Sequence, residues 1–99
     1  MMDLSFNRSV QKDVDEIIDH YEAISDQLAS RFFRDMEIRL SEIQENPKRF
    51  PKDQNYPSYR KVKMKKFPYC IVYRVLSYKI RILVIKHENR KLGFGMKRL

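Results

Sequence analysis

The stretch FPYCIVYRVLSYKIRILVIKH, residues 67–87, decides the fold of this 99-residue chain. Residues 67–76 are rich in β-branched and aromatic side chains, and residues 79–87 continue in the same way after a short interruption. Both runs are typical of β-strands. Only Ser77 and Tyr78 separate them, which predicts a tight turn between two neighbouring antiparallel strands.

Upstream of this pair, residues 59–66 alternate in part between apolar and polar side chains and predict another strand. Residues 47–58 contain three prolines and no clean period, which predicts a loop. At the start of the chain, Met2, Leu4 and Phe6 alternate with polar residues, which predicts a short, half-buried strand.

Between that first strand and the loop, two apolar patterns at helical spacing predict an antiparallel helix hairpin. Ser9 is expected to cap the first helix and Ser25 or Asp26 the second, which ends at Asn46 because the residue before Pro47 avoids the helical region. The buried stripe of the first helix is expected to contain Val10, Val14, Ile17, Ile18, Tyr21 and Ile24. That of the second is expected to contain Ala29, Phe33, Met36, Leu40 and Ile43, broadened by Leu28 and Phe32.

The predicted order is β-α-α-β-β-β. Two helices must bury their stripes on one face of a small twisted antiparallel sheet, so the expected fold class is α+β, with a helical hairpin on one face of the sheet. No repeat or shift in composition divides the chain, so we expect one domain over residues 1–99. The single cysteine, Cys70, cannot form an internal disulfide, and neither a signal peptide nor a membrane-spanning run is visible. We therefore expect a cytoplasmic protein with no membrane partner.

Charge is sorted along the chain. Residues 1–45 contain 5 Lys/Arg and 11 Asp/Glu, a net charge of −6, whereas residues 46–99 contain 16 and 2, a net charge of +14; together they give +8. The acidic half holds the first strand and the helices, and the basic half holds the loop and the other strands. Because the helices cover one sheet face, the basic side chains are expected on the other face and along its rims. Such a surface indicates an anionic partner, either a nucleic acid or an acidic protein.

One face of residues 59–67 (YRKVKMKKF) carries three lysines: Lys61, Lys63 and Lys65. They indicate either a contact surface for phosphates or an acidic partner, or a solvated edge strand that lysines protect from further pairing. Other cations of the basic half favour a contact surface, since one edge cannot use them all. These are Arg74, Arg81, Lys86, Arg90, Lys91, Lys97 and Arg98.

His87 ends the last strand among cations, which favour a neutral imidazole. Such a ring can act as general acid or base in RNA cleavage, with arginines stabilising the developing charge; alternatively, it only packs or hydrogen-bonds at the strand end. Cys70 is expected to be buried as a small apolar residue. No metal-ligand spacing or Gly-rich phosphate loop is present, so no metal or cofactor is expected. Four carboxylates are expected on the solvated face of the first helix: Asp13, Asp15, Glu16 and Asp19.

Four pieces of the sequence resemble the RelE/ParE superfamily of toxins from bacterial type II toxin–antitoxin systems, and most of all its ParE-like branch. They are LSFNRSVQKDVDEI, LASRFFRDMEIRLSEIQENPKRFP, YRKVKMKKFPYCIVYRV and IRILVIKHENRK, whose final motif places His87 three residues before Arg90. The resemblance covers nearly the whole chain. It implies two helices on a small antiparallel sheet and a growth-inhibiting toxin that a cognate, usually acidic, antitoxin silences in a hetero-oligomer. It also implies one of two targets: DNA gyrase for the ParE-like branch, or mRNA on the ribosome for the RelE-like branch.

Two residues depart from the ribonuclease pattern of this superfamily. Cys70 stands where ribonuclease members carry an arginine, and Phe94 stands where many carry a tyrosine. A thiol lacks the fixed positive fork of a guanidinium, and a phenyl ring lacks a hydroxyl for proton transfer. We therefore expect a ParE-like toxin that binds DNA gyrase without turning over a substrate. Its expected contact residues are Arg60, Lys63, Lys65, Arg74, His87 and Arg90.

Two alternatives stay open. The first is a RelE-like, ribosome-dependent mRNA endoribonuclease in which Arg60 or Arg74 stabilises the phosphate charge and His87 is the acid or base. The second is a decayed toxin that retains only antitoxin binding or co-repression on operator DNA.

Overall fold

The computed structural model describes residues 2–98 and confirms the predicted element order. Met1 and Leu99, the outermost residues of the predicted domain, lie outside the described residues. The elements are β1 (Asp3–Phe6), α1 (Val10–Glu22), α2 (Asp26–Glu45), β2 (Arg60–Lys63), β3 (Tyr69–Val75) and β4 (Lys79–His87).

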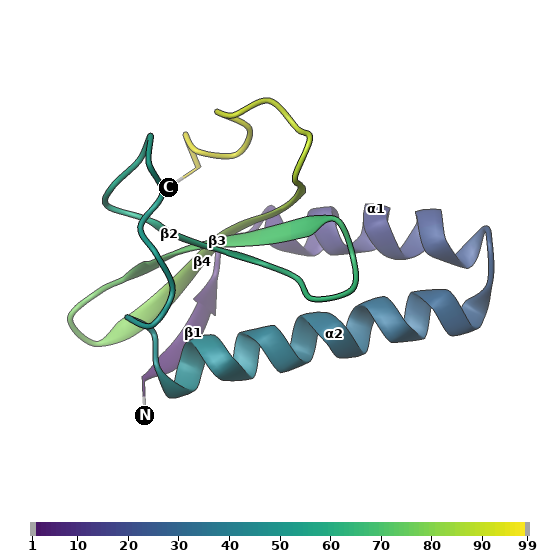
Figure 1. The fold of residues 1–99 in the computed structure, drawn as a ribbon, viewed down its shortest axis with the longest axis horizontal. Coiled ribbons are helices and arrows are strands. Elements are labelled where there is room, and N and C mark those ends of the chain that lie inside the picture. Colours follow the sequence, from purple (N-terminus) through teal and green to yellow (C-terminus); the bar gives the residue numbers. More distant parts are fainter. Residues whose placement is uncertain (1, 99) are drawn as a thin grey trace.

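The two helices form the predicted antiparallel hairpin (Figure 1). Ser25 caps α2, because its Oγ accepts a hydrogen bond from the Leu28 N–H at 3.0 Å, and the helix ends before Pro47 as predicted. Ser9 occupies the N-cap position of α1, but its side chain makes no capping bond. Instead, the Ser9 N–H donates a hydrogen bond to Asn7 Oδ1 at 2.9 Å, which fixes the turn between β1 and α1.

The four strands form one sheet in the order β1-β4-β3-β2. The β2–β3 and β3–β4 pairs are antiparallel as predicted, but β1 is parallel to β4, so the sheet is mixed. A parallel pair needs a long crossover connection, and the helix hairpin together with β2 and β3 provides one. The predicted tight turn at Ser77 and Tyr78 is present, since the Leu76 N–H donates to the Lys79 carbonyl at 2.9 Å.

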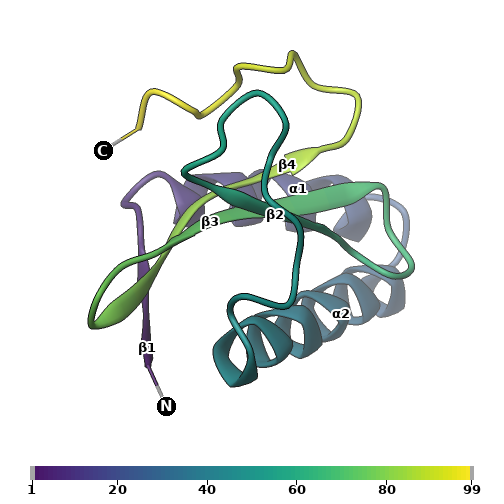
Figure 2. The same cartoon turned by 60° about the vertical axis from the view of Figure 1, so that its left-hand side comes forward.

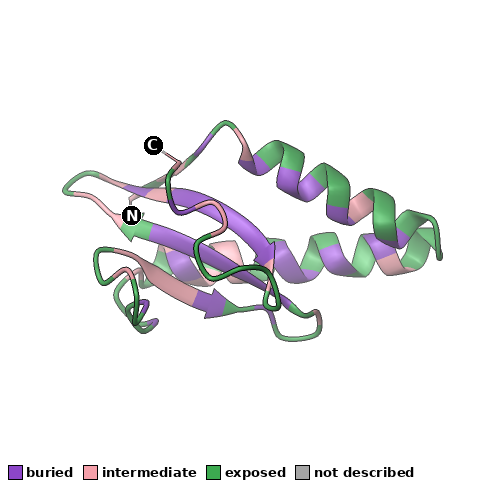
Figure 3. Cartoon of the chain, turned by 90° about the horizontal axis from the view of Figure 1, so that it is seen from above, coloured by how far each residue is buried: buried purple, intermediate pink, exposed green. Residues whose placement is uncertain are grey.

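One hydrophobic core lies between the helix hairpin and the sheet, and β3 and β4 are buried along most of their length (Figure 3). The buried stripe predicted for α2 was wrong at Phe33, which is 44% exposed, whereas the neighbouring Phe32 is fully buried. Phe32 takes the inner position because its ring packs edge-on against Phe67 and Tyr69, at centroid distances of 5.4 and 5.5 Å. Ile24, predicted in the stripe of α1, lies beyond the end of that helix and is exposed.

The opposite face of the sheet is also covered, because the segment after β4 runs over it (Figure 2). The pairing of β3 with β4 is irregular here: Val72 pairs with Val84, but the next residue, Tyr73, pairs with Ile82. Leu83 is therefore an extra residue in β4, and both Leu83 and Val84 contribute to this face. Basic side chains were predicted on this face and along its rims, but the face is not an open positive surface, because apolar side chains and the segment after β4 cover it. A second hydrophobic cluster occupies this face and consists of Val72, Leu83, Val84 and Met96, with Tyr56, Tyr59 and Phe94 packed against it.

Candidate target-binding surface

His87 and Arg90 lie together at one end of the sheet, in a hollow of about 230 Å³ between α1 and the segment after β4. The His87 ring packs edge-on against Tyr69, with the ring centroids 5.1 Å apart. The Arg90 guanidinium lies 4.4 Å from the centre of the Phe94 ring. Two carboxylates, Asp13 and Glu16, also line this hollow, so its charge is mixed rather than uniformly positive.

A backbone hydrogen bond limits the chemistry of His87. The Asn89 N–H donates to His87 Nδ1 at 3.0 Å. An imidazole nitrogen that accepts a hydrogen bond carries no proton, so the proton of the neutral ring is on Nε2. Neither nitrogen of that neutral ring then has a free lone pair with which to act as a general base.

Arg60 and Arg74 lie together in another hollow, at the opposite end of β3. His87 pairs with Tyr69 of β3. Arg74 lies five residues further along β3 than Tyr69, which corresponds to roughly 17 Å at the usual rise of a strand. The structure therefore does not bring His87 together with either arginine that the endoribonuclease alternative requires.

Lys63 and Lys65 form ion pairs within the chain. Lys63 Nζ lies 3.9 Å from Glu88 Oε2, and Lys65 Nζ lies 3.5 Å from Glu42 Oε2. Burial acts to raise the pKa of Glu42, but Lys65 and Arg39 together hold that pKa below its ordinary value. The two lysine side chains are 73% and 51% exposed, so these pairs are weak and both cations remain accessible to an anionic partner.

Cys70 is fully buried, as predicted. Burial raises the pKa of its thiol, despite the neighbouring amino groups of Lys61 and Lys86, so a reactive thiolate is disfavoured. Phe94 packs against the second hydrophobic cluster, and its ring contacts the guanidinium groups of both Arg90 and Arg98. Neither residue supplies the charge or the hydroxyl that a nuclease would need at its position.

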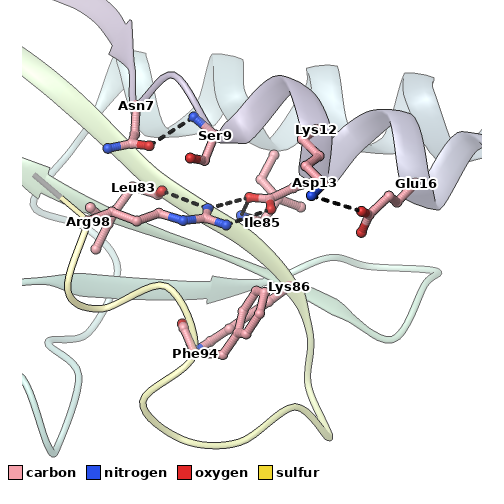
Figure 4. A network of polar contacts seen from close by, with 10 residues as sticks. All are labelled: Asn7, Ser9, Lys12, Asp13, Glu16, Leu83, Ile85, Lys86, Phe94 and Arg98. Atoms are coloured by element: carbon pink, nitrogen blue, oxygen red, sulfur yellow. Dashed lines mark hydrogen bonds and ion pairs between the residues drawn. The ribbon is translucent and has the colours of Figure 1, made fainter.

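Asp13 was predicted on the solvated face of α1, and this was wrong: it is buried. Figure 4 shows its polar contacts. Its Oδ2 and Oδ1 accept hydrogen bonds from the Arg98 guanidinium at 2.6 and 2.9 Å, and its Oδ2 also accepts one from the Ile85 N–H at 3.2 Å. The carboxylate of Asp13 on α1 thus receives its hydrogen bonds from β4 and from the segment that follows it. The remaining three carboxylates of the predicted set are exposed as expected: Asp15, Glu16 and Asp19.

Lys86 also holds the segment after β4 in place. Its Nζ donates to the carbonyl oxygens of Leu92 and Phe94 at 3.1 and 3.2 Å, and burial lowers the pKa of its amino group. Lys86 and Arg98, which the sequence placed in the general basic surface, therefore have structural contacts instead.

A family model described as the ParE toxin of type II toxin–antitoxin system, parDE, matches residues 4–92. This chain belongs to the ParE toxin family. A solved structure described as a chromosomal ParDE toxin–antitoxin system from P. aeruginosa is similar to this ParE-family chain, with 26% sequence identity and a TM-score of 0.79. The match covers 88% of this chain and 96% of that one. Among curated proteins, none matches this sequence.

The family match confirms the resemblance to the ParE-like branch of the superfamily. In this ParE-family toxin, four of the six predicted contact residues form two separate groups rather than one surface: His87 and Arg90 at one end of the sheet, and Arg60 and Arg74 at the other. The other two, Lys63 and Lys65, line neither of these hollows. Sequence reasoning missed Lys48 and Lys52, which join the second group. Their only sequence signal was the density of cations in the loop between α2 and β2.

None of the helices in residues 2–98 is long and apolar enough to cross a membrane.

Proposed function

We propose that this ParE-family toxin stops bacterial growth by binding DNA gyrase, and that a cognate antitoxin neutralises it in a cytoplasmic hetero-oligomer. The observation that carries the proposal is the family match over residues 4–92. The similar structure is described as a ParDE toxin–antitoxin system, which supports an antitoxin partner. The net charge of +14 in residues 46–99 would speed the encounter with an acidic antitoxin.

The geometry favours binding over turnover. A general base and the cations that stabilise a phosphate transition state must reach the same phosphate group. Here His87 lies roughly 17 Å from Arg74 by the rise of β3. Arg90 lies in the same hollow as His87, but the acceptor nitrogen of the His87 ring is occupied by the Asn89 N–H. The predicted contact residues therefore serve in this proposal as binding groups, with no catalytic role.

Expression of the chain alone in a bacterial host that carries a DNA-damage reporter tests the proposal. We expect growth arrest with induction of the reporter, because a poisoned gyrase leaves broken DNA. Co-expression of a cognate antitoxin is expected to restore growth, and the antitoxin is expected to co-purify with the toxin.

The same purified toxin, added to a translation extract, distinguishes the alternatives. Primer extension is expected to show no new mRNA ends. Ribosome-dependent cuts that a His87→Ala variant loses would establish the endoribonuclease alternative instead. Harmless expression of the free toxin, together with a tight antitoxin complex, would establish the decayed toxin.

A further inference from the structure

A basic hollow lies on the rim of the sheet, where the start of β2 and the end of β3 meet the loop that follows α2 (Figure 1, left). Four of its lining residues are cations: Lys48, Lys52, Arg60 and Arg74. The hydroxyl-bearing residues Ser58 and Ser77 also line it, and none of its lining residues among residues 2–98 carries a carboxylate. We call this site the rim hollow.

The charge of the rim hollow is not neutralised within the described part of the chain. None of its four cations takes part in an ion pair there, in contrast to Lys63, Lys65 and Arg98. Asp53, the acidic residue of the same loop, is buried, and its Oδ1 accepts hydrogen bonds from two backbone N–H groups of the loop. Four like charges gathered without a counter-charge create a positive potential that favours a bound anion.

The two guanidinium groups of the rim hollow are held in position. Arg60 Nη1 donates to the carbonyl oxygens of Phe50 and Lys48 at 2.7 and 3.3 Å. The Arg74 guanidinium lies over the Tyr59 ring, 5.9 Å from its centre. Because two hydrogen bonds hold the Arg60 guanidinium before any ligand arrives, binding to this group loses less side-chain entropy.

The loop that carries the two lysines is itself anchored to the sheet. The Tyr73 hydroxyl donates to the Pro47 carbonyl at 2.6 Å, immediately before Lys48. The backbone of Lys52 pairs with that of Arg60 as an isolated bridge at the edge of β2. The rim hollow is therefore a preformed feature of the fold.

We propose that the rim hollow binds the phosphodiester backbone of a nucleic acid. Arginine, lysine and serine side chains are the usual partners of backbone phosphates. The hollow has no aromatic lining residue on which a base could stack, so we expect binding that is independent of sequence.

A protein partner suits the rim hollow less well, because protein interfaces are usually centred on apolar or aromatic anchors in desolvated pockets. None of the large exposed hydrophobic side chains of residues 2–98 lines the hollow. The proposal goes beyond gyrase binding, since a toxin can bind gyrase with or without touching nucleic acid. It selects Arg60 and Arg74 from the predicted contact residues and adds Lys48 and Lys52.

Fluorescence anisotropy with the purified full-length chain tests the proposal, with a labelled 20-base-pair DNA duplex and a single-stranded RNA as probes. The test variant is K48Q/R74Q, because both side chains are exposed and neither donates a hydrogen bond to another of residues 2–98. The matched control is R31Q/R34Q, which removes the same charge from the exposed surface of α2. Thermal unfolding checks that both variants fold.

Each phosphate contact contributes about −0.9 to the slope of log K against log salt, so two lost contacts reduce the slope by about 1.8. We expect K48Q/R74Q to bind roughly 60-fold more weakly than the wild type at 0.1 M salt, and R31Q/R34Q to stay within about threefold. Loss confined to K48Q/R74Q with either probe supports the proposal, and the two probes tell DNA from RNA.

Three results would overturn the nucleic-acid proposal. The first is no binding of either probe at 50 mM salt. The second is equal weakening in both variants, which would indicate net charge rather than a site. The third is polyglutamate of matched charge binding as tightly as DNA with the same loss in K48Q/R74Q, which would assign the rim hollow to an acidic protein.

Discussion

Asp13 joins three parts of the chain that are far apart in sequence. Its carboxylate, on α1, accepts hydrogen bonds from the Ile85 N–H on β4 and from Arg98 in the segment that follows. The Asp13 and Arg98 side chains are only 7% and 19% exposed, so neither charge is well solvated. Removing one member of such a pair leaves the other buried and uncompensated, which costs more than the loss of a surface ion pair.

We predict that Asp13→Ala lowers the free energy of unfolding by about 3 kcal/mol, measured by urea denaturation. Asp15→Ala is the matched control on the same helix, and we expect a change within about 0.5 kcal/mol because Asp15 is exposed. Equal effects of the two substitutions would show that the contact with Arg98 contributes nothing beyond the loss of a helix carboxylate.

Tyr73 is fully buried, and its hydroxyl donates a hydrogen bond to the Pro47 carbonyl. Burial raises the pKa of this phenol to about 12, although the nearby Arg60 acts to lower it. The unfolded chain releases the phenolic proton near pH 10, whereas the folded chain keeps it. The unfolded state therefore binds fewer protons between these values, and stability falls as the pH rises through that window.

We predict that Tyr73→Phe removes a loss of roughly 1.4 kcal/mol of stability per pH unit between about pH 10 and 12. Below pH 10 the variant is expected to be less stable than the wild type by about 1 kcal/mol, because the Pro47 carbonyl loses its donor. Urea denaturation from pH 8 to 11 measures both effects. Parallel pH profiles of the two proteins would contradict the assigned pKa of Tyr73.

The segment after β4 acts as a covering element although residues 88–98 contain no helix or strand. Lys86 and Asp13 hold it through hydrogen bonds, and Met96 inserts into the second hydrophobic cluster. Gly95 permits this path because its φ is +78°, and a Cβ at this position would lie 2.7 Å from Val84 Cγ2. An alanine there meets both backbone strain and a clash.

We predict that Gly95→Ala destabilises the docked segment by about 2 kcal/mol and speeds trypsin cleavage after Arg90 and Lys91. Gly93→Ala is the control, since its Cβ would lie 3.3 Å from the Tyr56 hydroxyl, which has room to move because Tyr56 is only half-buried. The two variants should differ clearly in cleavage rate under native conditions. Identical rates would mean that the conformation of Gly95 does not determine docking.

The sequence predicted the elements well where a local period decides them. The strand pair of residues 67–87 and the helix hairpin capped by Ser25 depend on neighbouring residues, and both are confirmed. The parallel placement of β1 was not predicted, because which sheet edge a terminal strand joins depends on the path of the whole chain. Asp13 was placed wrongly for the same reason: its partner lies 85 positions away, and the local pattern shows only an acidic first turn.

At the scale of the molecule, the basic half of the chain covers the sheet instead of leaving one positive face open. Lys86 and Arg98 have structural contacts, and four of the six predicted contact residues lie in two groups at opposite ends of the sheet. The sequence predicted most members of these groups but not their separation. The distance between residues on different strands depends on how the strands are paired, and the sequence pattern does not give that pairing. Separate groups are suited to binding a large target at several points, whereas a nuclease needs its groups at one phosphate.

A supercoiling assay with purified gyrase and relaxed plasmid tests our proposal that this ParE-family toxin acts by binding gyrase. We predict that the toxin inhibits supercoiling in proportion to its concentration, and that prior mixing with the cognate antitoxin abolishes the inhibition. Undiminished supercoiling at a large molar excess of folded toxin would contradict the account.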